Sequence, residues 1–167
     1  MDALLPGFAA LEDVHPLVVH FPIALWSVAL LFWVLGLRGR EDLWRAGRWM
    51  LYLGSVAALV AVTTGLWAED RLGHETPGHE LVHVHRNLMV TATALGGTTA
   101  VLAWLARARS GPWTHAGLLA ALLATTAVCA LGADRGALLV YGHGVGMSVA
   151  DRAAEGHERA AGSEHAH

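Results

Sequence analysis

The sequence of 167 residues has no lysine, only one cysteine and few charged residues of any kind. A lone cysteine excludes an intramolecular disulfide, and the apolar surroundings of Cys129 in the chain are typical of a packing residue. Asp, Glu, Lys and Arg make up 15% of the chain and hydrophobic residues 54%, a balance far from that of soluble globular proteins. The composition therefore favours an integral membrane protein.

Two classes of function have no support in the sequence. The net charge is −3, so we expect no binding to nucleic acid. The chain also has no recognisable nucleophile triad and no phosphate-binding loop. These absences favour an electron-transfer or auxiliary protein over an enzyme.

Four apolar runs lack Asp, Glu, Lys and Arg, and each is long enough to cross a bilayer as a helix. They predict an all-α fold, an up-down four-helix bundle within a transmembrane domain over residues 1–147. The expected spans are about 16–37, 46–68, 83–106 and 114–133. Residues 148–167 have few bulky apolar side chains, so we expect a flexible, histidine-containing C-terminal tail.

The distribution of arginine predicts the orientation of the bundle. The segment between the first two spans carries Arg38, Arg40, Arg45 and Arg48, and Arg107 and Arg109 follow the third span. Because arginine-rich loops stay in the cytoplasm, both termini are expected to face outward. The first fourteen residues carry three acidic and no basic residues, the reverse of a signal peptide, so the first span is expected to be retained.

In this orientation, every histidine except His115 falls at or near the outward side. His15 and His20 lie in the stretch HPLVVHFPIAL, and His20 falls at a depth where ionisable side chains usually face the bundle interior. Pro22 removes a backbone donor near the carbonyl of Val18 and can kink the helix, which would free a backbone polar group one turn from His20. The clustering favours a functional histidine site.

The entry to the third span, HELVHVHRN, places His79 and His83 on one helical face and His85 on another. The string also matches the HExxH pattern of zinc proteases, in which Glu80 would activate water. No third histidine stands at the spacing of the extended protease motif, so a metalloprotease is the least favoured alternative.

Beyond the fourth span, GALLVYGHGVGM at residues 136–147 is apolar but too short to cross the membrane. We expect a short re-entrant or interfacial segment there. Its glycines permit a close backbone approach, which would bring His143 over the outer mouth of the bundle.

The stretches HPLVVHFPIAL, His83–Asn87 and LVYGHGVGM resemble a bacterial family of four-span membrane proteins of unknown function. The resemblance covers nearly the whole chain up to about Ser148 and implies the bacterial inner membrane. It departs from the family pattern at Arg135–Gly136, where paired glycines are expected, and at Met147, where valine is usual. Such proteins resemble small membrane cytochromes, and related domains occur beside cytochrome c-like modules. The matching positions are His15, Pro16, His20, Pro22, His83, Tyr141, Gly142, His143, Gly144 and Gly146.

Facing imidazoles within a bundle could ligate a haem b. We therefore predict axial iron ligands at His20 and His83, with His85 and His143 as alternatives, and further cofactor contacts from His15, Arg86, Arg135 and Tyr141. The expected function is electron transfer near the outer face of a respiratory membrane, with a cytochrome c-like or quinone-linked partner. Binding or transport of Zn or Cu and a non-catalytic auxiliary subunit remain open, as do homo-oligomers and hetero-oligomers.

Overall fold

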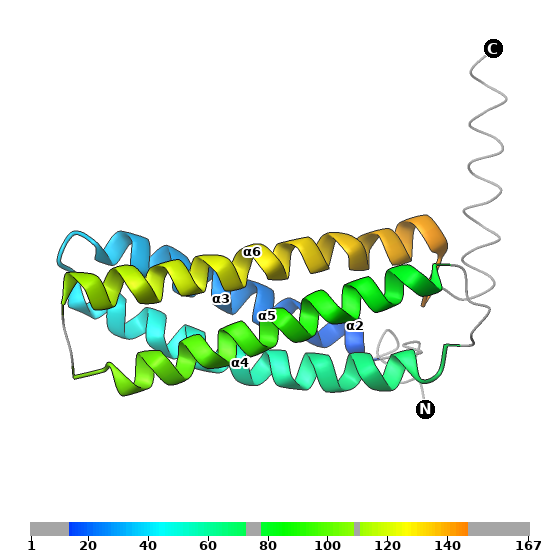
Figure 1. Ribbon diagram of the computed structural model, residues 1–167, viewed down its shortest axis with the longest axis horizontal. Helices are drawn as coiled ribbons and strands as arrows, with labels where there is room; N and C mark the ends of the chain where they lie inside the picture. The colour runs from blue at the N-terminus through cyan, green and yellow to red at the C-terminus, as the bar shows by residue number, and fades with distance from the viewer. Residues whose placement is uncertain (1–13, 73–77, 109–110, 147–167) are drawn as a thin grey trace, which may run out of the picture.

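A computed structural model describes residues 14–72, 78–108 and 111–146 of the chain, and these residues form helices and turns (Figure 1). The helices are α2 (His15–Val18), α3 (His20–Gly36), α4 (Glu41–Glu69), α5 (His79–Leu105) and α6 (Pro112–His143). With α2 and α3 taken as one span, four segments are long and apolar enough to cross a membrane. The predicted all-α four-helix bundle is confirmed, whereas its orientation stays a prediction. The expected tail, 148–167, lies outside the described residues.

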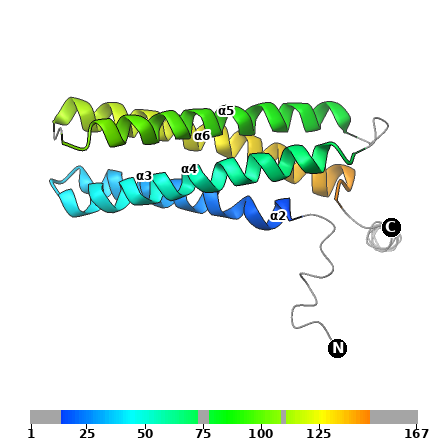
Figure 2. The ribbon, with the colours of Figure 1, turned by 90° about the horizontal axis from the view of Figure 1, so that it is seen from below.

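The bundle consists of two helical hairpins that lie against each other. Helix α3 packs along α4 and α5 packs along α6, and the hairpins meet mainly between α4 and α5 (Figure 2). At one end of the molecule α2 and α5 begin while α4 and α6 end (Figure 1). We call this the histidine end, because His15, His79, His83, His85 and His143 all lie there.

The first span is interrupted at Val19, which separates α2 from α3. Pro22 lies one turn further on and has no amide hydrogen to donate to the carbonyl of Val18. The chain continues in the same direction, with the Val19 amide donating to the His15 carbonyl at 3.2 Å. Val19 itself keeps helical dihedrals, with φ of −60° and ψ of −24°, so the kink expected from Pro22 stays a prediction.

Two helices are longer than the apolar runs predicted. Helix α4 begins at Glu41 rather than near residue 46, and α6 continues ten residues past 133 to His143. Residues 136–143 are therefore the last turns of α6, and the prediction of a separate re-entrant segment over 136–147 is wrong for this part. The helix ends where Gly144 takes a positive φ of 65°, the usual conformation of a helix-terminating glycine.

Buried residues recur along each helix at alternating intervals of three and four, the spacing of coiled-coil packing. In α3 they are Pro22, Trp26, Ala29, Trp33 and Gly36, and in α5 they are Val82, Ala92, Gly96, Thr99 and Ala103. The remaining faces expose large apolar side chains such as Phe21 and Leu59, as expected of helices surrounded by lipid. The core is thus a narrow seam between the hairpins.

Within the first hairpin, aromatic rings pack between α3 and α4 by lying over glycines of the facing helix. The pairs between α3 and α4 are Trp44 over Gly36, Trp33 over Gly47 and Trp26 over Gly54. The Trp33 indole also donates a hydrogen bond to the Trp44 carbonyl at 3.1 Å. A methyl group at any of these glycines would overlap the ring, so the pairs fix the register of the hairpin.

Candidate histidine site

His15 continues the pattern of rings over glycines to the histidine end. A β-carbon at Gly65 of α4 would lie 2.8 Å from Cε1 of its ring. Nδ1 lies 3.0 Å from the Ala61 carbonyl and 3.2 Å from the Thr64 hydroxyl. Because a carbonyl can only accept, Nδ1 carries the proton and the lone pair of the neutral ring is on Nε2. The end of α4 thus sets both the position and the tautomer of His15.

His85 has the same arrangement in the other hairpin. Its Nδ1 donates to the Gly132 carbonyl of α6 at 2.8 Å, and a β-carbon at Gly136 would lie 2.9 Å from its Cε1. The lone pair of the neutral ring is again on Nε2. Each hairpin therefore holds one half-buried imidazole in a gap left by a glycine.

These two imidazoles meet across the seam between the hairpins. The ring centroids of His15 and His85 are 6.5 Å apart, and the ring planes are inclined by 81°. The contact joins α2, which packs on α4, to α5, which packs on α6. Both residues were assigned to a site from the sequence, and they come from opposite hairpins of the bundle.

A second group of side chains lies beside this pair at the start of α5, and we call it the Glu69 cluster: Glu69, His79, His83 and Arg86. Arg86 donates to Oε1 of Glu69 at 2.7 Å, and Nδ1 of His83 lies 3.2 Å from the same oxygen. Nε2 of His83 and Nε2 of His79 are 3.1 Å apart. As predicted, His79 and His83 share one face of the helix, whereas His85 faces elsewhere.

His20 does not join either group, and the prediction that it faces the bundle interior is wrong. Its side chain is exposed on α3. The buried stripe of this helix begins at Pro22, two residues later, and two residues turn an α-helix by roughly 200°. His20 therefore lies on the opposite face from the seam, so the structure does not bring together the predicted ligand pair of His20 and His83.

The remaining predicted residues surround the histidine end. The exposed His143 lies against Gly78. Gly78 is the residue directly before α5 and has a positive φ of 82°. Arg135 pairs with its neighbour Asp134 at 2.5 Å, and Tyr141 is 72% exposed on the last turns of α6. Arg86 is engaged by Glu69. A role for these four side chains in holding a cofactor stays a prediction.

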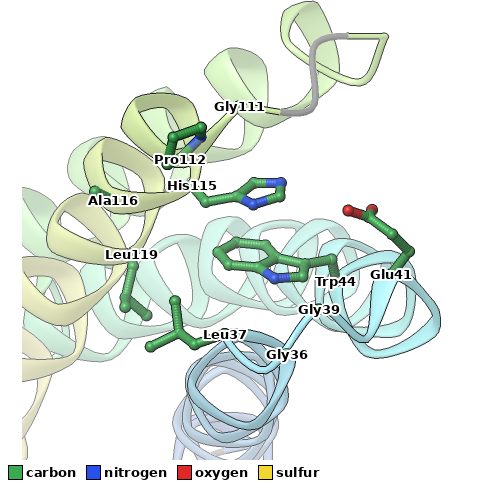
Figure 3. A pocket seen from close by; sticks show the side chains of 10 residues that line it. All are labelled: Gly36, Leu37, Gly39, Glu41, Trp44, Gly111, Pro112, His115, Ala116 and Leu119. Carbon is green, nitrogen blue, oxygen red and sulfur yellow. The ribbon is translucent and has the colours of Figure 1, made fainter.

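At the opposite end of the bundle, an open pocket of about 540 Å³ lies between the α3–α4 turn and the start of α6 (Figure 3). His115 lies flat over Trp44 there, with ring centroids 3.9 Å apart and planes within 13° of parallel. Trp44 in turn stacks on Trp33 at 5.0 Å. His115 is therefore a packing residue of this end, far along the bundle from the other described histidines.

The heptad spacing of the sequence contains a signal for the His15–His85 pair. His15 lies seven residues before Pro22, and His85 lies seven residues before Ala92, so each is in register with a buried residue. Gly65 and Gly136 occupy equivalent positions on α4 and α6, following Ala58 and Cys129 at intervals of seven. No such spacing predicted a role for Glu69, because its partners His83 and Arg86 come from another helix.

The family model described as "Predicted membrane protein (DUF2231)" matches residues 12–149, which include all the described helices. The chain belongs to this family. No curated protein and no solved structure matches it. Membership of DUF2231 supports the family resemblance inferred from the histidine and glycine motifs, and with the four apolar helices it indicates a protein embedded in a bilayer. The likeness to small membrane cytochromes stays a prediction.

Proposed function

We propose that this protein binds a haem b at the histidine end and carries electrons in a bacterial membrane, with His15 and His85 as the iron ligands. The observation that carries the proposal is the 6.5 Å separation of these two rings across the seam. The proposal replaces the pair expected from the sequence, His20 and His83, with two imidazoles whose rings meet in an edge contact across the seam.

The distance between the rings suits two ligands on opposite sides of one metal ion. A metal–nitrogen bond to imidazole is about 2 Å and the ring centre lies roughly 1 Å behind the nitrogen, so such centroids are about 6 Å apart. The nearly perpendicular ring planes are compatible with this arrangement, because each ligand ring can rotate about its own bond to the metal.

The hydrogen bonds of the two rings also suit iron ligands. Metal-binding histidines usually donate their second ring N–H to a carbonyl or carboxylate, which fixes the tautomer and raises the basicity of the ligating nitrogen. His15 and His85 both do so through Nδ1, to the carbonyls of Ala61 and Gly132. In these tautomers Nε2 of each ring would be the ligating nitrogen.

A haem held by two imidazoles supplies one-electron transfer, and no position on the metal remains for a substrate. This chemistry fits an electron carrier or a redox subunit of a respiratory chain. With both termini outward, the His15–His85 pair would lie near the outer face, where a cytochrome c-like or quinone-linked partner could exchange electrons.

The test is the visible spectrum of the full-length protein, produced in bacterial membranes with haem supplied and purified in detergent. We expect a Soret band and, after reduction with dithionite, the sharp α and β bands of low-spin, six-coordinate haem. His15→Ala and His85→Ala should each lose these bands. Added imidazole should restore them in part, because it can enter the space left by the deleted ring.

The matched control is His20→Ala, which removes an exposed imidazole five residues from His15 and should leave the spectrum unchanged. A colourless wild-type protein with haem supplied would refute the proposal. Loss of the bands in His20→Ala, with the bands retained in His15→Ala, would return the ligand role to His20.

A further inference from the structure

We infer that the Glu69 cluster is a second, separate site that binds a divalent transition-metal ion through Nε2 of His79 and Nε2 of His83. These nitrogens come from successive turns of α5 and are 3.1 Å apart. Two imidazole nitrogens bound to one tetrahedral zinc ion, with bonds of 2.0–2.1 Å, are separated by about 3.3 Å. The pair is therefore close to chelating geometry, and the inference is independent of the proposed haem.

The side chain of Glu69 orients His83 for this role. Nδ1 of His83 is buried, has no well-aligned hydrogen-bond partner, and lies 3.2 Å from Oε1 of Glu69. An ionised carboxylate oxygen attracts an N–H group and has no hydrogen to donate, so it favours the tautomer in which Nδ1 is protonated and the lone pair is on Nε2. In the metal-free protein this lone pair accepts a hydrogen bond from Nε2 of His79 at 3.1 Å, and a bound ion would take the place of that proton, leaving His79 protonated on Nδ1.

Arg86 in turn holds the carboxylate. Its guanidinium donates to the same Oε1 of Glu69 at 2.7 Å, and the Glu69 side chain is 16% exposed. The chain of contacts from Arg86 through Glu69 to His83 corresponds to the carboxylate–histidine–metal arrangement common in metalloproteins. Arg86 also balances the charge of Glu69. The two imidazoles would therefore be the only side chains that bind the ion directly.

The number of ligands determines the class of ion and the kind of site. Within residues 14–72, 78–108 and 111–146, no group of three or more His, Cys, Asp and Glu side chains is arranged around a common metal position. Two imidazoles therefore leave other coordination positions to water. Imidazole suits zinc, copper, nickel and cobalt, whereas calcium and magnesium prefer oxygen ligands. The site is an open, exchangeable one at the surface of the histidine end.

The experiment is a titration of the full-length protein, purified in detergent through a tag without histidine, with zinc and then with cobalt. Wild type should bind one more equivalent of zinc than His79→Ala or His83→Ala, or bind it at least tenfold more tightly. Cobalt should give visible d–d absorption that both variants lack. Glu69→Gln should weaken binding by about 10-fold to 100-fold, the usual effect of losing an outer carboxylate.

His20→Ala serves as the control for an unrelated exposed imidazole, and the tail histidines contribute equally to every variant. His85→Ala should keep this metal site while losing the haem bands, which separates this inference from the proposed function. Circular dichroism in the presence of a chelator checks that each variant is folded. Equal stoichiometry and affinity in wild type and a folded His79→Ala/His83→Ala double variant would overturn the inference.

Discussion

His15 and Gly65 are in direct contact, such that a β-carbon on the glycine would lie 2.8 Å from Cε1 of the imidazole. Gly65→Ala should push the ring out of its place and weaken its hydrogen bond to the Ala61 carbonyl. We expect a loss of stability of about 1–3 kcal/mol, typical of overpacking, measured as a lower midpoint of thermal unfolding in detergent. Haem content should fall with it.

Gly97→Ala is the control for this change, because a β-carbon at Gly97 meets nothing within 4 Å. Alanine also has the better helix propensity, so this variant should be as stable as wild type or slightly more stable. Equal unfolding midpoints for Gly65→Ala and Gly97→Ala would contradict the close contact between Gly65 and the His15 ring.

Trp33 supports the opposite half of the same hairpin. Its indole is fully buried and donates to the Trp44 carbonyl at 3.1 Å. Trp33→Phe removes the donor and part of the ring, which should cost about 1–2 kcal/mol in unfolding free energy. Trp113→Phe, at a side chain that is 89% exposed, should cost nothing measurable. If Trp33→Phe were as stable as wild type, the packing and hydrogen bond of this indole would not contribute to the stability of the bundle.

Glu69 connects the end of α4 to the start of α5 through Arg86 and His83. Glu69→Gln should loosen the first turns of α5, with faster amide hydrogen exchange there, at a cost of about 1 kcal/mol or less for these partly exposed pairs. Raising the salt concentration should speed exchange in wild type more than in the variant. Glu80→Gln, an exposed neighbour, should behave as wild type.

The orientation of the bundle can be tested with single cysteines in a Cys129→Ser background. Arg40→Cys lies in the turn before α4 and Glu80→Cys in the first turn of α5, and both side chains are exposed. If the arginine-rich ends are cytoplasmic, a membrane-impermeant maleimide should label Glu80→Cys in intact cells and Arg40→Cys only after permeabilisation. The reverse pattern would place both termini inside.

The number of helices could be predicted from the sequence because four uncharged runs of spanning length leave few other folds. The ends of the helices could not. Asp134 and Arg135 lie on the less buried faces of α6, where a helix accommodates them, whereas a prediction based on charge alone ends the span before them. The first turn of α4, from Glu41 to Trp44, was missed for the same reason.

The site could be predicted only in part. The sequence indicated that histidines gather at one end, and it assigned His15 and His85 to that site. The expected depth in the membrane then favoured His20 as an iron ligand. The position of His15, seven residues before the buried Pro22, instead places His15 on the buried face of the span. The contacts of His15 with Gly65 and of His85 with Gly136 depend on the registers of two hairpins, and a single sequence contains no direct measure of register.

The rings that lie over glycines of α3 and α4 together prevent one helix from shifting along the other. Trp44, Trp33, Trp26 and His15 each occupy one gap, so a shift of one helix along the other would force all four rings out of place at once. The imidazole at one end of the bundle and the indoles at the other thus depend on one common register of the two helices. A substitution at Gly36 is therefore expected to alter the environment of His15 although it lies at the far end of the molecule.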